Sequence, residues 1–97
     1  MSTVELAAES VLSNSVLFTV FGEADPALLP RIVALFAKCG LVPARFQAEA
    51  FGEEMHVEVE FADLNPTRAD HFAEVMRQMP VVSLVRLRRA ALLGGLR

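Results

Sequence analysis

The amino-acid sequence predicts an α+β fold, in which a four-stranded antiparallel sheet carries two helices on one face. Two strand–helix–strand units follow one another along the chain, and a hairpin turn at Gly52 joins them. No linker or low-complexity segment divides the two units. Right-handed crossovers insert the first strand of the second unit into the gap of the first. The predicted architecture is therefore a ferredoxin-like βαββαβ sandwich.

The first unit opens with a strand over Ser15–Phe21. This run is rich in Val, Phe and Thr, and both of its faces are apolar, as is typical of a central strand. A helix over Pro26–Cys39 follows, with Asp25 as its N-cap and Gly40 just past its end.

One residue of this helix conflicts with the predicted start. Pro30 lies in the second turn, where a proline removes a backbone hydrogen bond. The helix therefore begins either with a strained turn at Pro26 or at Pro30 itself, and both versions leave loop amides near Ala24 to Leu28 free for a ligand. At 100° per residue, seven apolar side chains share an arc of about 160°: Leu35, Leu28, Cys39, Ile32, Phe36, Leu29 and Val33.

The next two strands are predicted to form a hairpin. Leu41–Phe51 alternates between apolar and polar residues and is half-buried, and Pro43 near its start indicates an edge strand. A turn at residues 51–54 leads to a second alternating strand, Glu54–Phe61, with Met55, Val57, Val59 and Phe61 facing inward.

The second unit repeats the cap-then-proline signal at its helix. Asn65 precedes a helix over Pro66–Met79, whose apolar arc includes Phe72 and Met76, and Pro80 ends it. The last strand is predicted over Val81–Arg88. The division of the chain is then a lead-in over residues 1–14, one domain over residues 15–89 and a tail over residues 90–97.

Composition points to a hidden apolar surface. The 97 residues are 54% hydrophobic with a mean hydropathy of +0.42, which is more apolar than a small monomer can easily bury. We therefore expect a subunit interface or a hydrophobic partner, and the apolar helix arc together with the edge strand favours a homodimer.

Several classes of function are disfavoured by composition. The longest uncharged stretch, Ser10–Gly22, is shorter than the roughly 20 residues that span a bilayer, so no membrane association is expected. The net charge of −3 disfavours nucleic acid. The acidic N-terminal residues Glu5 and Glu9 disfavour a signal peptide, and the single cysteine, Cys39, fits a reducing cytoplasm.

The sequence contains no constellation that predicts catalysis, a metal site or a cofactor. Acidic residues crowd the predicted hairpin, and the simplest interpretation is cross-strand pairing with Arg45 or with arginines of the last strand. His56 and His71 lack partners at metal-ligand spacing, and Cys39 falls in the apolar arc, where a small buried residue is expected.

The loop before the first helix is the candidate binding site. It leads the chain into a helix N-terminus, where free amides and the helix dipole favour a carboxylate. The alternative is an ordinary capped loop. The candidate ligand-binding residues are Gly22, Glu23, Ala24, Asp25, Pro26, Ala27 and Leu28.

With this order of elements the chain resembles an ACT domain, a small regulatory module that pairs through its sheets and often binds an amino acid at the dimer interface. The resemblance lies in VLFTVF, DPALLPRIVALFAKCG and LVPARFQA. The family pattern at the helix start is Asp-x-Pro-Gly-x-Leu. Pro26 and Leu29 match it, whereas Ala24 and Ala27 replace its aspartate and glycine.

The resemblance implies a non-catalytic regulatory function in amino-acid metabolism. Among short free-standing ACT proteins, the chain is similar to the small subunits of acetolactate synthase, which implies an amino-acid effector and a larger catalytic subunit as partners. The alternative is a small dimeric α+β-barrel enzyme of the monooxygenase or isomerase kind. Such an enzyme needs a mostly apolar outer sheet face, and here that face carries Arg45, Glu58 and Arg86.

Overall fold

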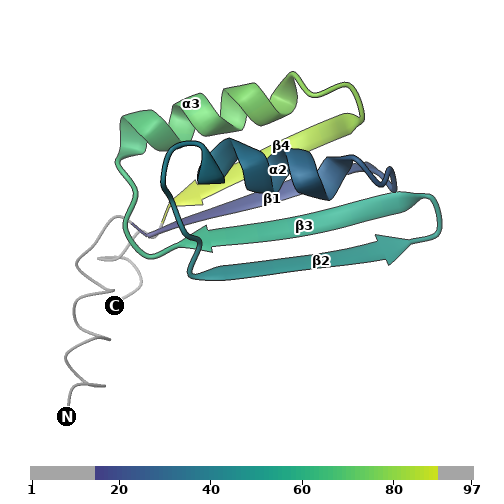
Figure 1. The fold of residues 1–97 in the computed structure, drawn as a ribbon, viewed down its shortest axis with the longest axis horizontal. Coiled ribbons are helices and arrows are strands. Elements are labelled where there is room, and N and C mark those ends of the chain that lie inside the picture. The colour runs from purple at the N-terminus through teal and green to yellow at the C-terminus, as the bar shows by residue number, and fades with distance from the viewer. Residues whose placement is uncertain (1–14, 90–97) are drawn as a thin grey trace, which may run out of the picture.

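The computed structural model describes residues 15–89, so the predicted lead-in and tail lie outside the described residues. The elements are β1 (Val16–Glu23), α2 (Leu28–Ala37), β2 (Arg45–Phe51), β3 (Glu54–Phe61), α3 (Pro66–Arg77) and β4 (Val82–Arg89). The four strands form one antiparallel sheet in the order β2-β3-β1-β4, with both helices on one face (Figure 1). The predicted βαββαβ fold is confirmed.

The strand β1 is central, as predicted, between β3 and β4. Its alternate residues Val16, Phe18 and Val20 are buried under the helices. The residues between them are half-buried on the opposite, outer face of the sheet. In β3 the inward set is also confirmed, with Val57, Val59 and Phe61 buried.

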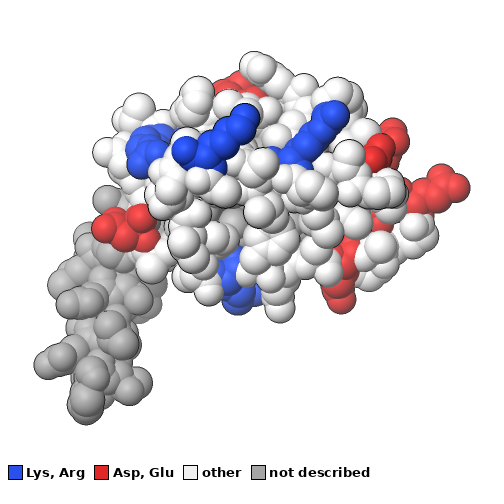
Figure 2. Space-filling view, in the orientation of Figure 1, with Lys and Arg blue, Asp and Glu red and all other residues white. Residues whose placement is uncertain are grey.

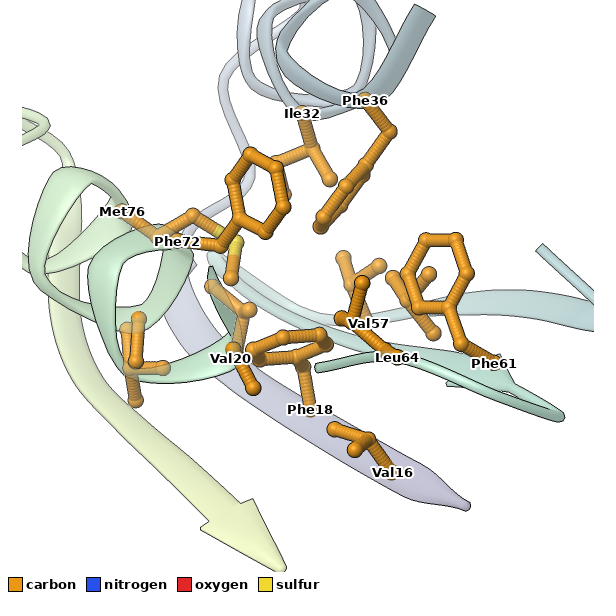
Figure 3. Close-up of a cluster of buried hydrophobic side chains, with 14 of the residues drawn as sticks. Val16, Phe18, Val20, Ile32, Phe36, Val57, Phe61, Leu64, Phe72 and Met76 are labelled. Carbon is orange, nitrogen blue, oxygen red and sulfur yellow. The ribbon is translucent and has the colours of Figure 1, made fainter. Parts of the chain in front are cut away.

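The core is organised around one phenylalanine of α2. The ring of Phe36 lies 4.8 Å from that of Phe61 in β3, 5.0 Å from that of Phe72 in α3 and 5.6 Å from that of Phe18 in β1 (Figure 3). Aromatic rings at these tilted and edge-on angles add to the stabilisation from area burial. This cluster therefore joins both helices to the two central strands.

The start of α2 differs from both predicted versions. The helix begins at Leu28, and the amide of Arg31 donates its first backbone bond to the carbonyl of Ala27. Pro30 is the third helical residue, so its missing N–H belongs to the first turn, where no intrahelical acceptor exists. The predicted conflict is therefore absent, and the prediction of a start at Pro26 or Pro30 was wrong.

The apolar arc of α2 is narrower than predicted. Leu28, Ile32 and Phe36 are buried, whereas Val33 is 49% exposed and Cys39 is also exposed. The prediction of a buried Cys39 was wrong because α2 ends at Ala37, before that residue. Gly40 does follow the helix end as predicted, with a φ of +71°, and the amide of Leu41 then donates to the carbonyl of Phe36.

The strand β2 is an edge strand, as predicted, but it is shorter and more exposed. It begins at Arg45 rather than Leu41, and Val42 before it is 85% exposed. On its inner face only Phe46 is half-buried, and Ala48 and Ala50 are exposed. The expected half-burial of the whole strand was wrong because the helical layer reaches only Phe46, near the start of β2.

The remaining elements agree closely with the prediction. The side chain of Asn65 accepts hydrogen bonds from the amides of Thr67 and Arg68, and Pro66 is the first residue of α3. Gly52 occupies the first turn position of the β2–β3 hairpin with a φ of +62°. Within residues 15–89, no helix is long and apolar enough to span a membrane.

Candidate functional site

The predicted loop over Gly22–Leu28 lies beside the β2–β3 hairpin. The amide of Ala24 donates to the carbonyl of Glu53 at 2.9 Å, which holds the two segments together. An open depression of about 610 Å³ lies between them. Asp and Glu side chains gather at this end of the molecule (Figure 2). The depression is lined by Glu23, Ala24, Asp25, Pro26, Gly52, Glu53 and Glu54.

The loop amides are not free for a ligand, contrary to the prediction. The Oδ1 atom of Asp25 accepts a hydrogen bond from the amide of Ala27 at 2.8 Å. The amide of Leu28 donates to the carbonyl of Asp25, and the amide of Asp25 donates to the carbonyl of Glu23. Pro26 has no N–H to offer a ligand. The loop forms a turn in which the carboxylate of Asp25 accepts the hydrogen bond that a ligand carboxylate would otherwise accept.

The two ends of the predicted site are structural. Gly22 is buried at an irregularity in the pairing of β1 with β4, and a Cβ there would lie 2.5 Å from the carbonyl oxygen of Val81. Leu28 is fully buried in the core. The accessible part of the predicted site is therefore the acidic rim formed by Glu23 and Asp25 together with Glu53 and Glu54.

This rim favours a positively charged group over a carboxylate. Four carboxylates border one depression, and none of them forms an ion pair with a lysine or arginine within residues 15–89. Like charges in proximity repel an anion and attract a cation such as an ammonium group. Ammonium recognition by Glu23 or Asp25 fits this geometry, whereas carboxylate recognition by the amides does not.

A second feature was not predicted from the sequence: an apolar groove between α2 and β2. This groove has a volume of about 110 Å³ and contains the exposed Val33 and Val42 and the half-buried Phe46. It lies at the start of the edge strand, where Phe46 lines it, and the rest of the inner face of β2 is exposed. The sequence signal was present in the apolar arc, but the arc was expected to be covered. The groove is lined by Val33, Phe36, Ala37, Leu41, Val42, Pro43 and Phe46.

Comparison with known proteins decides the family. The profile of the ACT-like domain matches residues 9–93, which is nearly the whole chain. The chain belongs to the ACT-like domain family. No curated protein sequence matches it. Domains of this family are typically regulatory, ligand-binding modules, and the resemblance to ACT domains is thus confirmed.

Solved structures support the same fold. The ACT domain of a GTP pyrophosphokinase from Chlorobium tepidum is 12% identical, with a TM-score of 0.68 over 78% of this chain and 100% of that domain. An ACT domain protein from Streptococcus pneumoniae is 15% identical, with a TM-score of 0.64 over 84% of this chain and 94% of that protein. The C-terminal domain of MgtC from Mycobacterium tuberculosis is 10% identical, with a TM-score of 0.64 over 80% of this chain and 88% of that domain.

Two acidic residues on the outer face of this ACT-like domain, Glu58 and Glu60, pair as predicted with Arg45. Its Nε atom lies 2.9 Å from a carboxylate oxygen of Glu60, and its Nη1 atom lies 3.6 Å from Glu58. The hydrogen bond with Glu60 raises the pKa of Arg45. The arginines of β4 behave differently, because Arg89 pairs with Asp70 of α3. Neither Arg86 nor Arg88 forms an ion pair with any described residue.

Of the two histidines of the ACT-like domain, His56 approaches the acidic rim, with its Nε2 atom 3.7 Å from a carboxylate oxygen of Glu54. His56 lies between the rings of Phe21 and Phe51, at 4.5 and 4.9 Å, on the outer face of the sheet. His71 is exposed on α3 beside Phe72. No group of three possible metal ligands comes together within the described part of the chain.

Proposed function

We propose that this ACT-like domain is a non-catalytic regulatory module that acts as a homodimer and binds an amino acid. The observation that carries the proposal is the open β2 edge beside an apolar groove. A strand with one unpaired side is a template for another strand, and an apolar surface next to it adds burial to the pairing.

The proposed dimer pairs β2 with β2 of a second copy. In an antiparallel pair the hairpin end of one β2 lies opposite the start of the other. The acidic rim of one protomer therefore lies near the segment before the partner's β2. The ligand's ammonium group binds Glu23 and Asp25, and its carboxylate is held outside this rim, since the local amides are engaged.

The proposed dimer also has a larger enzyme as its partner. A regulatory dimer acts on a larger metabolic enzyme, of which an acetolactate synthase-like catalytic subunit is the example that the sequence resemblance supplies. The alternative α+β-barrel enzyme is less well supported, because such a pocket requires an apolar outer face. The ion-paired Arg45, Glu58 and Glu60 lie on that face.

The dimer is tested with Val33→Glu/Val42→Glu, two charges placed on exposed groove residues. Because both side chains are exposed, we expect the fold to be retained and the edge dimer to be lost in sedimentation velocity. The matched control Thr67→Glu/Gln78→Glu adds the same charge to exposed residues of α3 and its cap. An unchanged sedimentation coefficient in the groove variant would exclude the proposed interface.

The ligand is tested by melting the protein with each of the twenty standard amino acids and with the matching 2-hydroxy acids. A ligand that binds only the folded state raises the melting temperature. We expect one amino acid to raise it and its 2-hydroxy acid, which lacks the ammonium group, to have no effect. Asp25→Asn keeps an oxygen for the amide of Ala27 and removes the charge, so it should abolish the shift. Equal shifts with both ligands, or no shift with any, would contradict ammonium recognition.

A further inference from the structure

The outer face of the sheet has a regular arrangement of charge about β1. Strand pairing places Glu58, Thr19 and Arg86 in one row across β3, β1 and β4. The neighbouring row contains Glu60, Leu17 and Arg88. In both rows the acidic residue lies on β3, on one side of β1, and the arginine lies on β4, on the other side.

The two arginines do not reach these carboxylates within one chain. Adjacent strands lie about 4.8 Å apart, so β3 and β4 are separated by roughly 10 Å with β1 between them. Arg45 of β2 instead binds Glu58 and Glu60. The guanidinium of Arg86 lies 5.8 Å from the ring centroid of Phe21, a cation–π geometry that holds it over the outer face.

The strip between the charges is largely apolar. Leu17 and Phe21 of β1 are half-buried, with their remaining surface on the outer face. Leu84 of β4 is 46% exposed and pairs with Phe21. The face therefore has an apolar centre, an acidic side along β3 and a basic side along β4. A surface of this composition is complementary to a partner with the opposite order of charge.

We propose that the outer face binds the outer face of a second copy, related by a two-fold axis parallel to β1. Rotation about this axis exchanges the β3 side with the β4 side and keeps each row at its own level. Arg86 and Arg88 of each protomer then face Glu58 and Glu60 of the other. The apolar strips of the two β1 strands meet at the centre, and aligned packing of two sheets is a common arrangement.

A second copy is favoured over a different protein because the charge pattern is complementary to itself. An unrelated anion would meet Arg86 and Arg88 but would be repelled by the neighbouring carboxylates. The contact is separate from the β2 edge, so the two interfaces together give a dimer of dimers. It depends on exposed charges, and its affinity should fall with added salt.

The test uses charge reversal in two complementary variants. Arg86→Glu/Arg88→Glu makes both sides of the face acidic. Arg45→Glu/Glu58→Arg/Glu60→Arg makes both sides basic and conserves the ion pairs between β2 and β3. We expect each variant alone to lose the salt-sensitive association in sedimentation velocity. An equimolar mixture should regain it, because every contact across the face then pairs opposite charges.

Controls separate this contact from the proposed edge dimer. Arg31→Glu/Arg68→Glu introduces the same change in net charge on the helical layer and should leave association unchanged. In the Val33→Glu/Val42→Glu background the remaining dimer should be the sheet-face dimer. Loss of all association there, with Arg86→Glu/Arg88→Glu behaving as wild type, would overturn the sheet-face contact and support the edge dimer alone.

Two further outcomes decide the proposal. If the mixture does not associate although both variants melt cooperatively, the two-fold arrangement is wrong. If the triple variant does not fold, Glu58→Gln/Glu60→Gln replaces it and must weaken the salt-sensitive association. Unchanged association in that neutral variant would also overturn the proposal.

Discussion

The two edges of the sheet differ in how their exposed backbone is protected. At β4, Arg77 of α3 donates a hydrogen bond to the carbonyl of Val85 at 3.0 Å, and Arg89 binds both Asp70 and the carbonyl of Pro66. At β2, no helix side chain in the described chain forms a hydrogen bond to the strand, and an apolar groove lies alongside. Within the described chain a helix side chain thus occupies one carbonyl of β4 and none of β2, and we call β4 the closed edge and β2 the open edge.

This difference explains why only one edge is a candidate for assembly. Side chains that occupy the outward carbonyls of an edge strand prevent a second strand from pairing with it. At β4 the protecting side chain, Arg77, comes from α3, which also packs on this strand. The same helix therefore provides both the edge protection and the core packing. At β2 no such hydrogen bond is present within residues 15–89 and only Phe46 packs against the core, so pairing with another copy can supply both protection and burial.

The largest expected loss of stability comes from disturbing the close approach of β1 to the start of β4 at Gly22. A Cβ at Gly22 would lie 2.5 Å from the carbonyl oxygen of Val81 and 3.2 Å from the Cα of Val82, both of them backbone atoms that cannot rotate away. We expect Gly22→Ala to lower the free energy of unfolding by about 1–3 kcal/mol, as overpacking does. Urea denaturation followed by circular dichroism measures it.

The control for this substitution is Gly52→Asn. No atom lies within 4 Å of a Cβ at Gly52, and asparagine tolerates its positive φ. The control should therefore cost less than Gly22→Ala. Equal costs for the two variants would show that β1 and β4 can move apart at Gly22, and the closed edge would then be less rigid than its hydrogen bonds indicate.

A smaller effect is expected from opening the closed edge directly. Arg77→Met conserves most of the aliphatic stem and removes the hydrogen bond to Val85, which should cost about 1 kcal/mol. Arg77 also pairs with Glu74, and Glu74→Gln removes only that exposed ion pair, for an expected cost below about 0.5 kcal/mol. Thermal denaturation of the two variants separates these contributions, and equal losses would contradict a protective role for the bond to Val85.

The sequence was sufficient for the fold because its strongest signals are local. Alternation in β3 and the Asn65-Pro66 cap both specify structure through neighbouring residues, and both predictions hold. The signal at α2 was misleading because Asp25-Pro26 has the same form. Here the Asp25 side chain bonds the amide two residues on, so it closes a turn before the helix instead of capping it.

The candidate site was harder to predict than the fold because it depends on how the helices are placed over the strands of the sheet. Hydrophobic periodicity identified the apolar arc of α2, but it does not show where the helix lies on the sheet. Val33 and Val42 are exposed because β2 lies beyond the helical layer, and this lateral offset is set by packing of Phe36 against the central strands and α3. The four-carboxylate rim likewise forms only because the fold brings Glu53 beside Ala24, which adds the hairpin carboxylates to those of the loop.

The smallest expected change in stability comes from a substitution in β2, at the open edge. Ala48 is exposed on the inner face of β2, so Ala48→Lys should change the unfolding free energy of the monomer by less than about 0.5 kcal/mol. If β2 pairs with a second copy, the wild type also gains stability as protein concentration rises, because dimerisation binds only the folded state. Ala48→Lys should remove that concentration dependence and leave the dilute monomer unchanged. A concentration-independent wild type, measured by urea denaturation across a wide range of protein concentration, would show that the open edge stays unpaired in solution.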